Sequence, residues 1–207
     1  MKYFTYLACI LFGLLKFNVS AQENVSPLDI NMLLSGTFGE LRGNHFHCGI
    51  DIKTNGTVGK KVYSINSGYV SRIKVSTWGY GKAIYINHPN GTTSVYAHLA
   101  KFSEKIDSVI KKEHYQKERF EINYYPNKDE LIIKRGELIA LSGNSGSSGG
   151  PHLHFEIRNT KTERPINPLS LGGLNITDNI APLLKSMKLY SISQSTINGK
   201  EKDKIFK

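Results

Sequence analysis

The stretch Pro151-His152-Leu153-His154-Phe155-Glu156-Ile157 alternates apolar and polar side chains. This period of two residues predicts a half-buried β-strand whose core face carries Leu153, Phe155 and Ile157. The opposite face carries the polar members of the stretch, His152, His154 and Glu156. Alternate residues on a strand are about 6.6 Å apart, so both imidazoles can enter one site at different depths. One can then bind a metal while the other reaches a water or a substrate, although two strand histidines without a function fit the same pattern.

Length and composition indicate a folded protein that is mainly β. The chain has 207 residues, of which 39% are hydrophobic and 21% are charged, a balance typical of soluble globular proteins. This length allows one domain with a substantial core. The 19 Gly, 11 Tyr and 9 Phe favour strands joined by many turns.

Residues 1–21 have the features of a secretory signal peptide. Lys2 precedes a mostly apolar run, and Val19-Ser20-Ala21 supplies small residues at a cleavage site. The run is short for a membrane-spanning helix, and we expect no stable membrane insertion after cleavage; an uncleaved anchor is the alternative. Cys9 would leave with the signal, so the exported chain would keep Cys48 alone and form no internal disulfide. Stability would then depend on the core or on a bound metal.

The charge of the chain predicts an anionic partner. The formal net charge of +10 falls to +8 without Lys2 and Lys16, because residues 1–21 contain no acidic residue. For an exported protein, this favours a cell-wall polymer or a membrane surface. Nucleic acid is not expected, since the sequence shows no helix-turn-helix pattern, zinc-finger spacing or aromatic RNA-binding signature.

Short strands separated by turn residues make up most of the chain. We expect them at 62–65, 68–73, 83–88, 92–98, 131–133 and 138–141. Pro89-Asn90-Gly91 predicts a hairpin turn, because Asn-Gly tolerates the positive φ of tight turns. The Gly/Ser-rich residues 143–150 lack the ending of a phosphate-binding P-loop and are interpreted as a flexible wall of a cleft.

Residues 102–130 interrupt this pattern. Ile106, Val109 and Ile110 form a short helical stripe that Ser103 could cap. Residues 120–125 then read as an extended arm, and Lys111, Lys112, Lys117 and Arg119 make the helical part basic. The segment is either a solvated flank or a wall of the substrate cleft with Tyr124 or Tyr125 on the substrate.

Pro and Gly residues suggest where domains end. We expect a leader segment at 22–35, one domain at 36–172, and a linker or the start of a further β domain at 173–207. The last segment is too short to form a core by itself.

A second polar cluster is His47-Cys48-Gly49-Ile50-Asp51. Residues i and i+4 of a straight strand lie about 13 Å apart, so His47 and Asp51 share one metal only if the chain bends. Gly49 allows such a bend, which predicts a loop at His47 and a strand starting near Asp51. Two imidazoles and one carboxylate then make a three-ligand zinc site with an open fourth position. His45 has the same parity as His47 and competes with it, whereas Cys48 would point away.

Tyr96-Ala97-His98-Leu99 completes the set of polar motifs. Alone, His98 would be a surface histidine. Beside a metal it could act as a general base or stabilise the oxyanion of a tetrahedral intermediate.

The three motifs, in this order, resemble the lysostaphin-type zinc metallopeptidases of bacterial cell walls. The resemblance covers roughly residues 36–170 and implies a duplicated hybrid motif, an all-β fold with sandwich- or barrel-like antiparallel sheets. It implies one zinc ion on His47, Asp51 and His154, and it implies catalytic roles for His98 and His152. It also implies a periplasmic or cell-envelope endopeptidase that cuts stem peptides or cross-links of peptidoglycan.

Two other functions fit parts of the sequence. The first is an envelope protein that binds peptidoglycan and recruits or activates a wall amidase without hydrolysing anything. The second is a sugar-transport phosphocarrier, which uses two facing histidines in the same fold. The export signal and Asp51 argue against a phosphocarrier, whose phosphoryl donors are cytoplasmic.

Overall fold

A computed structural model describes residues 24–174, 176, 183–184, 186–190, 196 and 204–206. The predicted signal peptide and most of 173–207 lie outside the described residues, so these predictions and the domain boundaries stay predictions. The chain divides into two units between Ile176 and Thr177. In the second unit, β13 (Met187–Leu189) and β14 (Lys204–Phe206) pair antiparallel.

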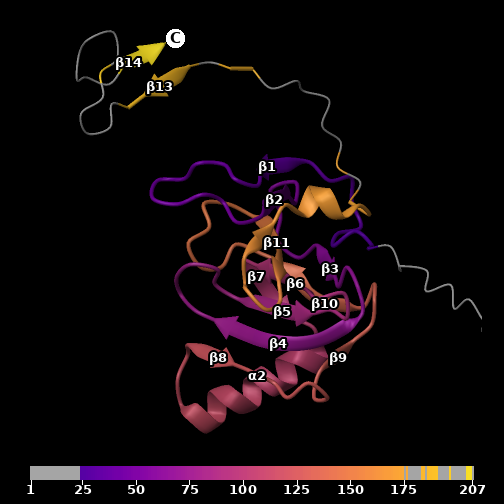
Figure 1. Cartoon of the computed structure of the whole chain (residues 1–207). Helices are drawn as coiled ribbons and strands as arrows, with labels where there is room; N and C mark the ends of the chain where they lie inside the picture. Colours follow the sequence, from indigo (N-terminus) through magenta and orange to yellow (C-terminus); the bar gives the residue numbers. More distant parts are fainter. Residues whose placement is uncertain are drawn as a thin grey trace, which may run out of the picture. The chain divides into compact units, whose positions relative to one another are not determined.

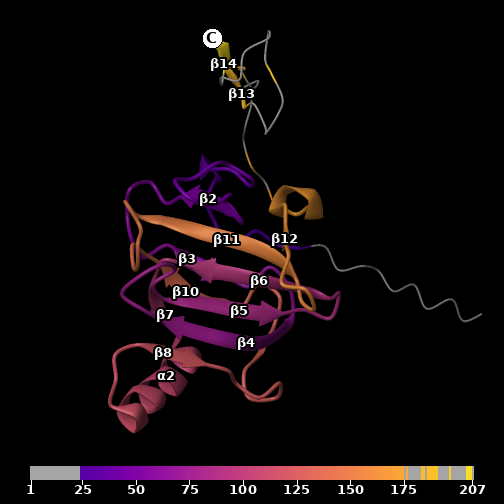
Figure 2. The ribbon, with the colours of Figure 1, turned by 60° about the vertical axis from the view of Figure 1, so that its left-hand side comes forward.

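The first unit is built on a nine-stranded antiparallel sheet (Figure 1). Its strand order is β1 (Leu34–Gly36), β2 (Ile50–Lys53), β11 (His152–Asn159), β6 (Thr92–Ala97), β5 (Ala83–Asn87), β4 (Gly68–Val75) and β8 (Ile122–Tyr124). The short strands β12 (Pro165–Ile166) and β9 (Ile132–Ile133) pair with β11 and β4. Figure 2 shows β11, β6, β5 and β4 side by side. The predicted antiparallel all-β class is confirmed.

A smaller sheet covers one face of the large one. It contains β3 (Lys61–Tyr63), β10 (Leu138–Ser142) and β7 (Leu99–Phe102). Side chains from both sheets form one core; Val62, Leu99 and Ile139 come from the small sheet, and Ile84 and Phe155 from the large one. A short 3₁₀-helix, Pro168–Leu171, follows β12.

The alternation predicted for 151–157 is confirmed on its apolar side. Leu153, Phe155 and Ile157 are buried in the common core. The polar side is also largely covered, since His154 and Glu156 are buried. The strand therefore carries a buried polar face, which requires partners for each of its polar groups.

The segment before β1 is part of this core. Leu28 and Met32, which fall in the predicted leader, are 1% and 0% exposed. Leu28 also forms an isolated bridge to Val62 of the small sheet. Residues 24–35 thus pack on the domain they precede.

The hairpin of β5 and β6 is confirmed, with one correction at its turn. Gly91 has a φ of +78°, whereas Asn90 is absent from the positive-φ residues of the described chain. The Gly91 amide donates to the carbonyl of His88 at 3.1 Å. Glycine alone therefore supplies the left-handed conformation that the turn requires.

The predicted insertion contains the one long helix of the described residues. Helix α2 (Glu104–Lys117) buries Ile106 and Ile110, as the stripe predicts. Ser103 occupies the N-cap position, but its side chain makes no capping hydrogen bond. The following arm forms β8 and pairs with β4, so it extends the large sheet. The described helices are all too short or too polar to cross a lipid bilayer.

Candidate active site

Strand register brings the distant motifs together. His154 of β11 lies opposite Asp51 of β2 on one side and opposite Ala97 of β6 on the other. His98 directly follows Ala97, and His152 lies two residues before His154 on the same strand. Antiparallel pairing thus places residues about 100 positions apart in the sequence on one sheet face.

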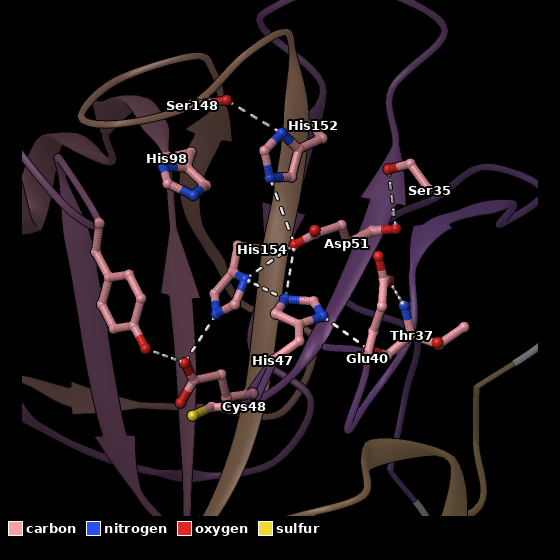
Figure 3. A network of polar contacts seen from close by, with 12 residues as sticks. Ser35, Thr37, Glu40, His47, Cys48, Asp51, His98, Ser148, His152 and His154 are labelled. Carbon is pink, nitrogen blue, oxygen red and sulfur yellow. Dashed lines mark hydrogen bonds and ion pairs between the residues drawn. The ribbon is translucent and has the colours of Figure 1, made fainter. Parts of the chain in front are cut away.

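His47, Asp51 and His154 converge at the end of this face (Figure 3). His47 Nε2 lies 3.0 Å from His154 Nδ1 and 3.2 Å from Asp51 Oδ1. His154 Nδ1 lies 2.9 Å from the same Asp51 oxygen. In the part of the chain that the structure describes, these residues form the one His/Cys/Asp/Glu group arranged to hold a metal.

The backbone explains how His47 and Asp51 meet. His47 lies in a loop, and β2 begins at Ile50, as predicted. The chain bends at Gly49, as predicted, and Gly49 is also needed for close packing, because a Cβ there would lie 2.3 Å from the carbonyl oxygen of Phe155. Gly36 has a similar role, since its Cβ would lie 2.6 Å from Asp51 Oδ2. Both glycines let the backbone of β1 and β2 approach the site.

Hydrogen bonds set the tautomers of both imidazoles. Nδ1 of His47 lies 2.9 Å from the carbonyl oxygen of Thr37, which can only accept. Nε2 of His154 lies 2.8 Å from the carboxylate of Glu156. Each hydrogen therefore sits on the ring nitrogen that points away from the cluster. His47 Nε2 and His154 Nδ1 present lone pairs toward Asp51 Oδ1.

This donor set fits a zinc ion. Three acceptor atoms separated by 2.9–3.2 Å repel one another unless a cation lies between them. Ligands of a tetrahedral zinc ion with bonds of about 2.0–2.1 Å are about 3.3 Å apart, close to these separations. Burial lowers the pKa of His154, but the carboxylates of Asp51 and Glu156 outweigh burial and raise it. The cluster thus favours positive charge.

A hydrogen-bonded chain supports the cluster from behind. Glu156 is fully buried and accepts from His154, from Tyr80 Oη and, at 2.6 Å, from Arg158 Nε. Burial raises the pKa of Glu156, but the bonds from His154 and Arg158 outweigh it and lower the pKa to about 2. Glu156 therefore stays ionised and orients His154, as carboxylates behind metal-binding histidines commonly do.

Asp51 is held in place from two sides. Arg42 Nη2 donates to Asp51 Oδ2 at 2.8 Å, which leaves Oδ1 for the cluster. Burial raises the pKa of Asp51, but the surrounding imidazoles of His152, His154 and His47 outweigh burial and hold the pKa well below its usual range. The carboxylate is therefore ionised at neutral pH.

His98 and His152 lie beside the cluster and face each other, with ring centroids 4.7 Å apart. Nδ1 of His98 donates to the carbonyl of Ser145 at 2.8 Å, and Nδ1 of His152 donates to the carbonyl of Gly150 at 2.8 Å. Both therefore keep Nε2 free of a proton, and His152 Nε2 lies 3.4 Å from Asp51 Oδ1. Burial lowers the pKa of His98 to about 4, so this ring is neutral near pH 7.

The backbone at His98 is strained. Its φ is +58°, an uncommon value for a residue with a side chain. His98 occupies the single position between β6 and β7, where the chain passes from the large sheet to the small one. Such strain persists only where the surroundings enforce it.

The Gly/Ser-rich loop forms a wall of the site, and hydrogen bonds hold it in place. The Ser147 amide donates to the carbonyl of Gly79 at 2.9 Å, and Ser145 Oγ donates to the carbonyl of Leu99 at 2.8 Å. A cleft of about 290 Å³ lies between this loop, Tyr80 and the five motif residues named above. It is large enough for a segment of extended peptide.

Two sequence alternatives are not part of the cluster. His45 is exposed and lies 2.6 Å from the side-chain oxygen of Asn44, although it lines the cleft. Cys48 Sγ lies 3.6 Å from the carbonyl of Phe46, and burial raises the pKa of its thiol. Neither joins the three acceptor atoms.

Sequence reasoning missed the supporting residues. Glu156 was placed on the polar face without a function, although a carboxylate two residues after a strand histidine shares its face. Tyr80 and Arg42 carry no comparable signal, because their contacts to Glu156 and Asp51 arise between separate segments.

Known proteins are similar to this chain in sequence. The model of peptidase family M23 matches residues 45–115 and 120–168. The DD-carboxypeptidase/endopeptidase Mpg of Neisseria meningitidis is 31% identical over 154 residues, 72% of this chain and 29% of Mpg. The glycyl-glycine endopeptidase ALE-1 of Staphylococcus capitis is 29% identical over 187 residues, 87% of this chain and 41% of ALE-1.

A solved structure has a similar fold. A zinc-containing peptidase from Vibrio cholerae aligns with a TM-score of 0.52 at 26% identity, over 70% of this chain and 38% of that one. The chain thus spans less than half the length of these relatives. The family match covers more than half of the chain and includes all five motif residues. The chain belongs to peptidase family M23.

Proposed function

We propose that this protein is a zinc-dependent endopeptidase that hydrolyses stem peptides or cross-links of bacterial peptidoglycan. The observation that carries the proposal is the convergence of His47 Nε2, Asp51 Oδ1 and His154 Nδ1 beside two further histidines. The names of the relatives support the substrate class, since they include endopeptidases and a peptidoglycan DD-endopeptidase of Vibrio cholerae.

His47, Asp51 and His154 would hold the ion beside the cleft that all three line. A zinc ion in such a site polarises a scissile carbonyl and lowers the pKa of bound water to about 7. Arg42 and Glu156 hold Asp51 and His154 in the orientation that this requires. Preorganised ligands of this kind avoid reorganisation during the reaction.

His98 and His152 move the proton. In the neutral state both present an unprotonated Nε2, so each is prepared to accept a proton from the attacking water. Once protonated, the same Nε2 becomes a donor that can stabilise the oxyanion or protonate the leaving amine. One histidine takes the first proton, and its neighbour less than 5 Å away assists.

The location follows from the substrate. Peptidoglycan lies outside the cytoplasmic membrane, and residues 1–21 have the features of an export signal. We therefore place the protein in the periplasm or cell envelope, with the basic surface of the chain favouring an anionic wall.

The proposal is tested by metal content and product release. The purified chain should bind about one equivalent of zinc and release new amines from purified sacculi, with fragments identified by mass spectrometry. His154→Ala should lose both metal and activity, whereas His152→Ala should keep the metal and lose activity. His114→Ala on the exposed side of α2 is the matched control and should change neither.

Other outcomes would contradict it. Zinc below half an equivalent after repletion, or intact sacculi with zinc-loaded protein, is incompatible with a zinc hydrolase. Binding to sacculi without release of amines would favour the amidase-recruiting alternative, which the comparisons do not favour.

A further inference from the structure

A second cavity lies on the sheet face that carries the metal ligands, farther along β11. Arg158 follows His154 by four residues on the strand, so their Cα atoms are about 13 Å apart. Arg158 pairs with Thr93 of β6, which pairs with Asn87 of β5, and all three line a cavity of about 220 Å³. A β-bulge in β4 adds Arg72 to the same cavity.

Tyr80 separates this cavity from the active-site cleft. Its ring stacks on His154 with centroids 5.1 Å apart, and its hydroxyl contacts Glu156. Arg158 Nη2 also donates to the Tyr80 hydroxyl at 3.2 Å. Tyr80 lines the active-site cleft, whereas Arg158 lines the second cavity, so the two hollows are distinct neighbours.

Arg72 is preorganised for an anion. Its guanidinium lies 5.0 Å from the ring centre of Tyr85 and 5.5 Å from that of Tyr125. Within the described part of the chain, only its Nε has a hydrogen-bond partner, Asn123 Oδ1 at 2.7 Å. Aromatic rings stack on the faces of a guanidinium, whereas its N–H groups point outward in its plane. The terminal N–H groups of Arg72 therefore stay available to an oxyanion that lies in this plane.

Arg72 has no ion-pair partner among the described residues. Arg158 lies on the same lining, but its Nε donates to the buried carboxylate of Glu156 at 2.6 Å, and the lining also contains the exposed Glu163. The neutral groups bond to one another, because Asn87 Oδ1 accepts from Ser71 Oγ at 3.0 Å and from Thr93 Oγ1 at 2.7 Å. Arg72 is therefore the group that would recognise an anionic ligand.

We propose that this cavity binds a free carboxylate of the peptide substrate. A planar carboxylate can accept from the parallel N–H groups of the arginine edge, and its single charge is balanced by one guanidinium, whereas a doubly charged phosphate would need a second positive group. The inference rests on the proposed function for the source of the carboxylate. An extended peptide rises about 3.3 Å per residue, so the 13 Å between His154 and Arg158 on β11 corresponds to about four residues of peptide, and a carboxylate at Arg72 on β4 would lie at least that far from the bond that is cut. The cavity would thus select among stem peptides.

Calorimetry on the full chain tests the proposal. The probes are N-acetyl-D-alanyl-D-alanine, its C-terminal amide and inorganic phosphate. The His154→Ala background removes a metal ligand, which prevents carboxylate binding to zinc from being mistaken for binding in the cavity. In this background the acid should bind and the amide should bind about tenfold or more weakly, as expected for charge-assisted hydrogen bonds.

Arginine variants locate the binding. Arg72→Gln should weaken acid binding about tenfold or more, and Arg72→Lys should weaken it less, because it keeps the charge. The matched control, Arg119→Gln, removes one positive charge between α2 and β8, outside the cavity lining, and should stay within about twofold of the parent. Thermal unfolding of each variant checks that it is folded.

Three results would overturn the inference: equal binding of acid and amide, no effect of Arg72→Gln, or tighter binding of phosphate than of carboxylate. Because these measurements use a background without hydrolysis, they are independent of the zinc and sacculus assays. Failure of the cavity proposal is therefore distinguishable from failure of the proposed function.

Discussion

Glu156→Gln isolates the effect of charge behind the proposed metal ligands. The substitution keeps the size of the side chain and replaces a carboxylate by an amide. All three partners of Glu156 are donors: His154 Nε2 at 2.8 Å, Arg158 Nε at 2.6 Å and the Tyr80 hydroxyl. A glutamine offers one oxygen and one NH₂ group, so at least one donor would face another donor.

The magnitude follows from which partner loses its acceptor. If the glutamine oxygen stays with His154, its NH₂ group faces Arg158, whose side chain is only 19% exposed. Losing a hydrogen bond to a charged group costs about 1.5–3 kcal/mol of folding free energy. His154 also loses the negative charge behind its ring, and loss of such an outer partner typically weakens metal binding about 10–100-fold, or about 1.4–2.7 kcal/mol.

A zinc competition titration against a fluorescent chelator measures the change. We expect zinc affinity to fall about 10–100-fold in Glu156→Gln, with release of amines from sacculi falling at subsaturating zinc. Glu121→Gln is the matched control, since Glu121 accepts hydrogen bonds from Ser76 and Thr77 at the exposed end of β4. A folded Glu156→Gln protein whose zinc affinity stays within about threefold of the wild type would refute the orienting role.

Three further predictions concern stability. Burial lowers the pKa of His88, so below pH 6.5 the unfolded chain binds a proton that the folded chain resists. In urea titrations between pH 7 and 5, the free energy of unfolding of the wild type should therefore fall by up to about 1.4 kcal/mol per pH unit more than that of His88→Asn, and an equal pH dependence of the two proteins would contradict this. Gly146 has a φ of +73°, and a Cβ there would lie 2.3 Å from the carbonyl oxygen of Gly79. Gly146→Ala should therefore lower both the melting temperature and the peptidase activity, and wild-type values for both would be inconsistent with the close approach of residue 146 to Gly79. Tyr96→Phe removes the hydroxyl oxygen that accepts a hydrogen bond from the buried amide of Ile65 at 2.9 Å. The free energy of unfolding should fall by about 1–3 kcal/mol, whereas an unchanged value would mean that the amide finds another partner.

Local patterns in the sequence are sufficient for much of the fold. The alternation in 151–157 places Leu153, Phe155 and Ile157 in the core because a strand has a period of two. Pro89-Asn90-Gly91 predicts the hairpin, since the turn needs a residue that tolerates positive φ. These features depend on neighbours in the chain, and so they can be recognised from one sequence.

The order of the motifs also predicts which residues meet. His47, Asp51 and His154 were selected because two imidazoles and a carboxylate suit zinc, and the family resemblance distinguished His154 from His152. The choice of ligand nitrogen was not accessible in this way. It depends on the carbonyl of Thr37 and the carboxylate of Glu156, and a backbone carbonyl leaves no trace in the residue types.

Features that join distant segments became visible only in the folded chain. Tyr80 reaches Glu156 across 76 positions of sequence, and Gly49, in addition to the bend at its own position, is required by the backbone of β11. The cavity between Arg72 and Arg158 forms because β4, β5, β6 and β11 lie side by side in register. Short-range patterns determine the strands and the chemical types available, whereas strand register determines which side chains share a site, because pairing partners are chosen by long-range packing.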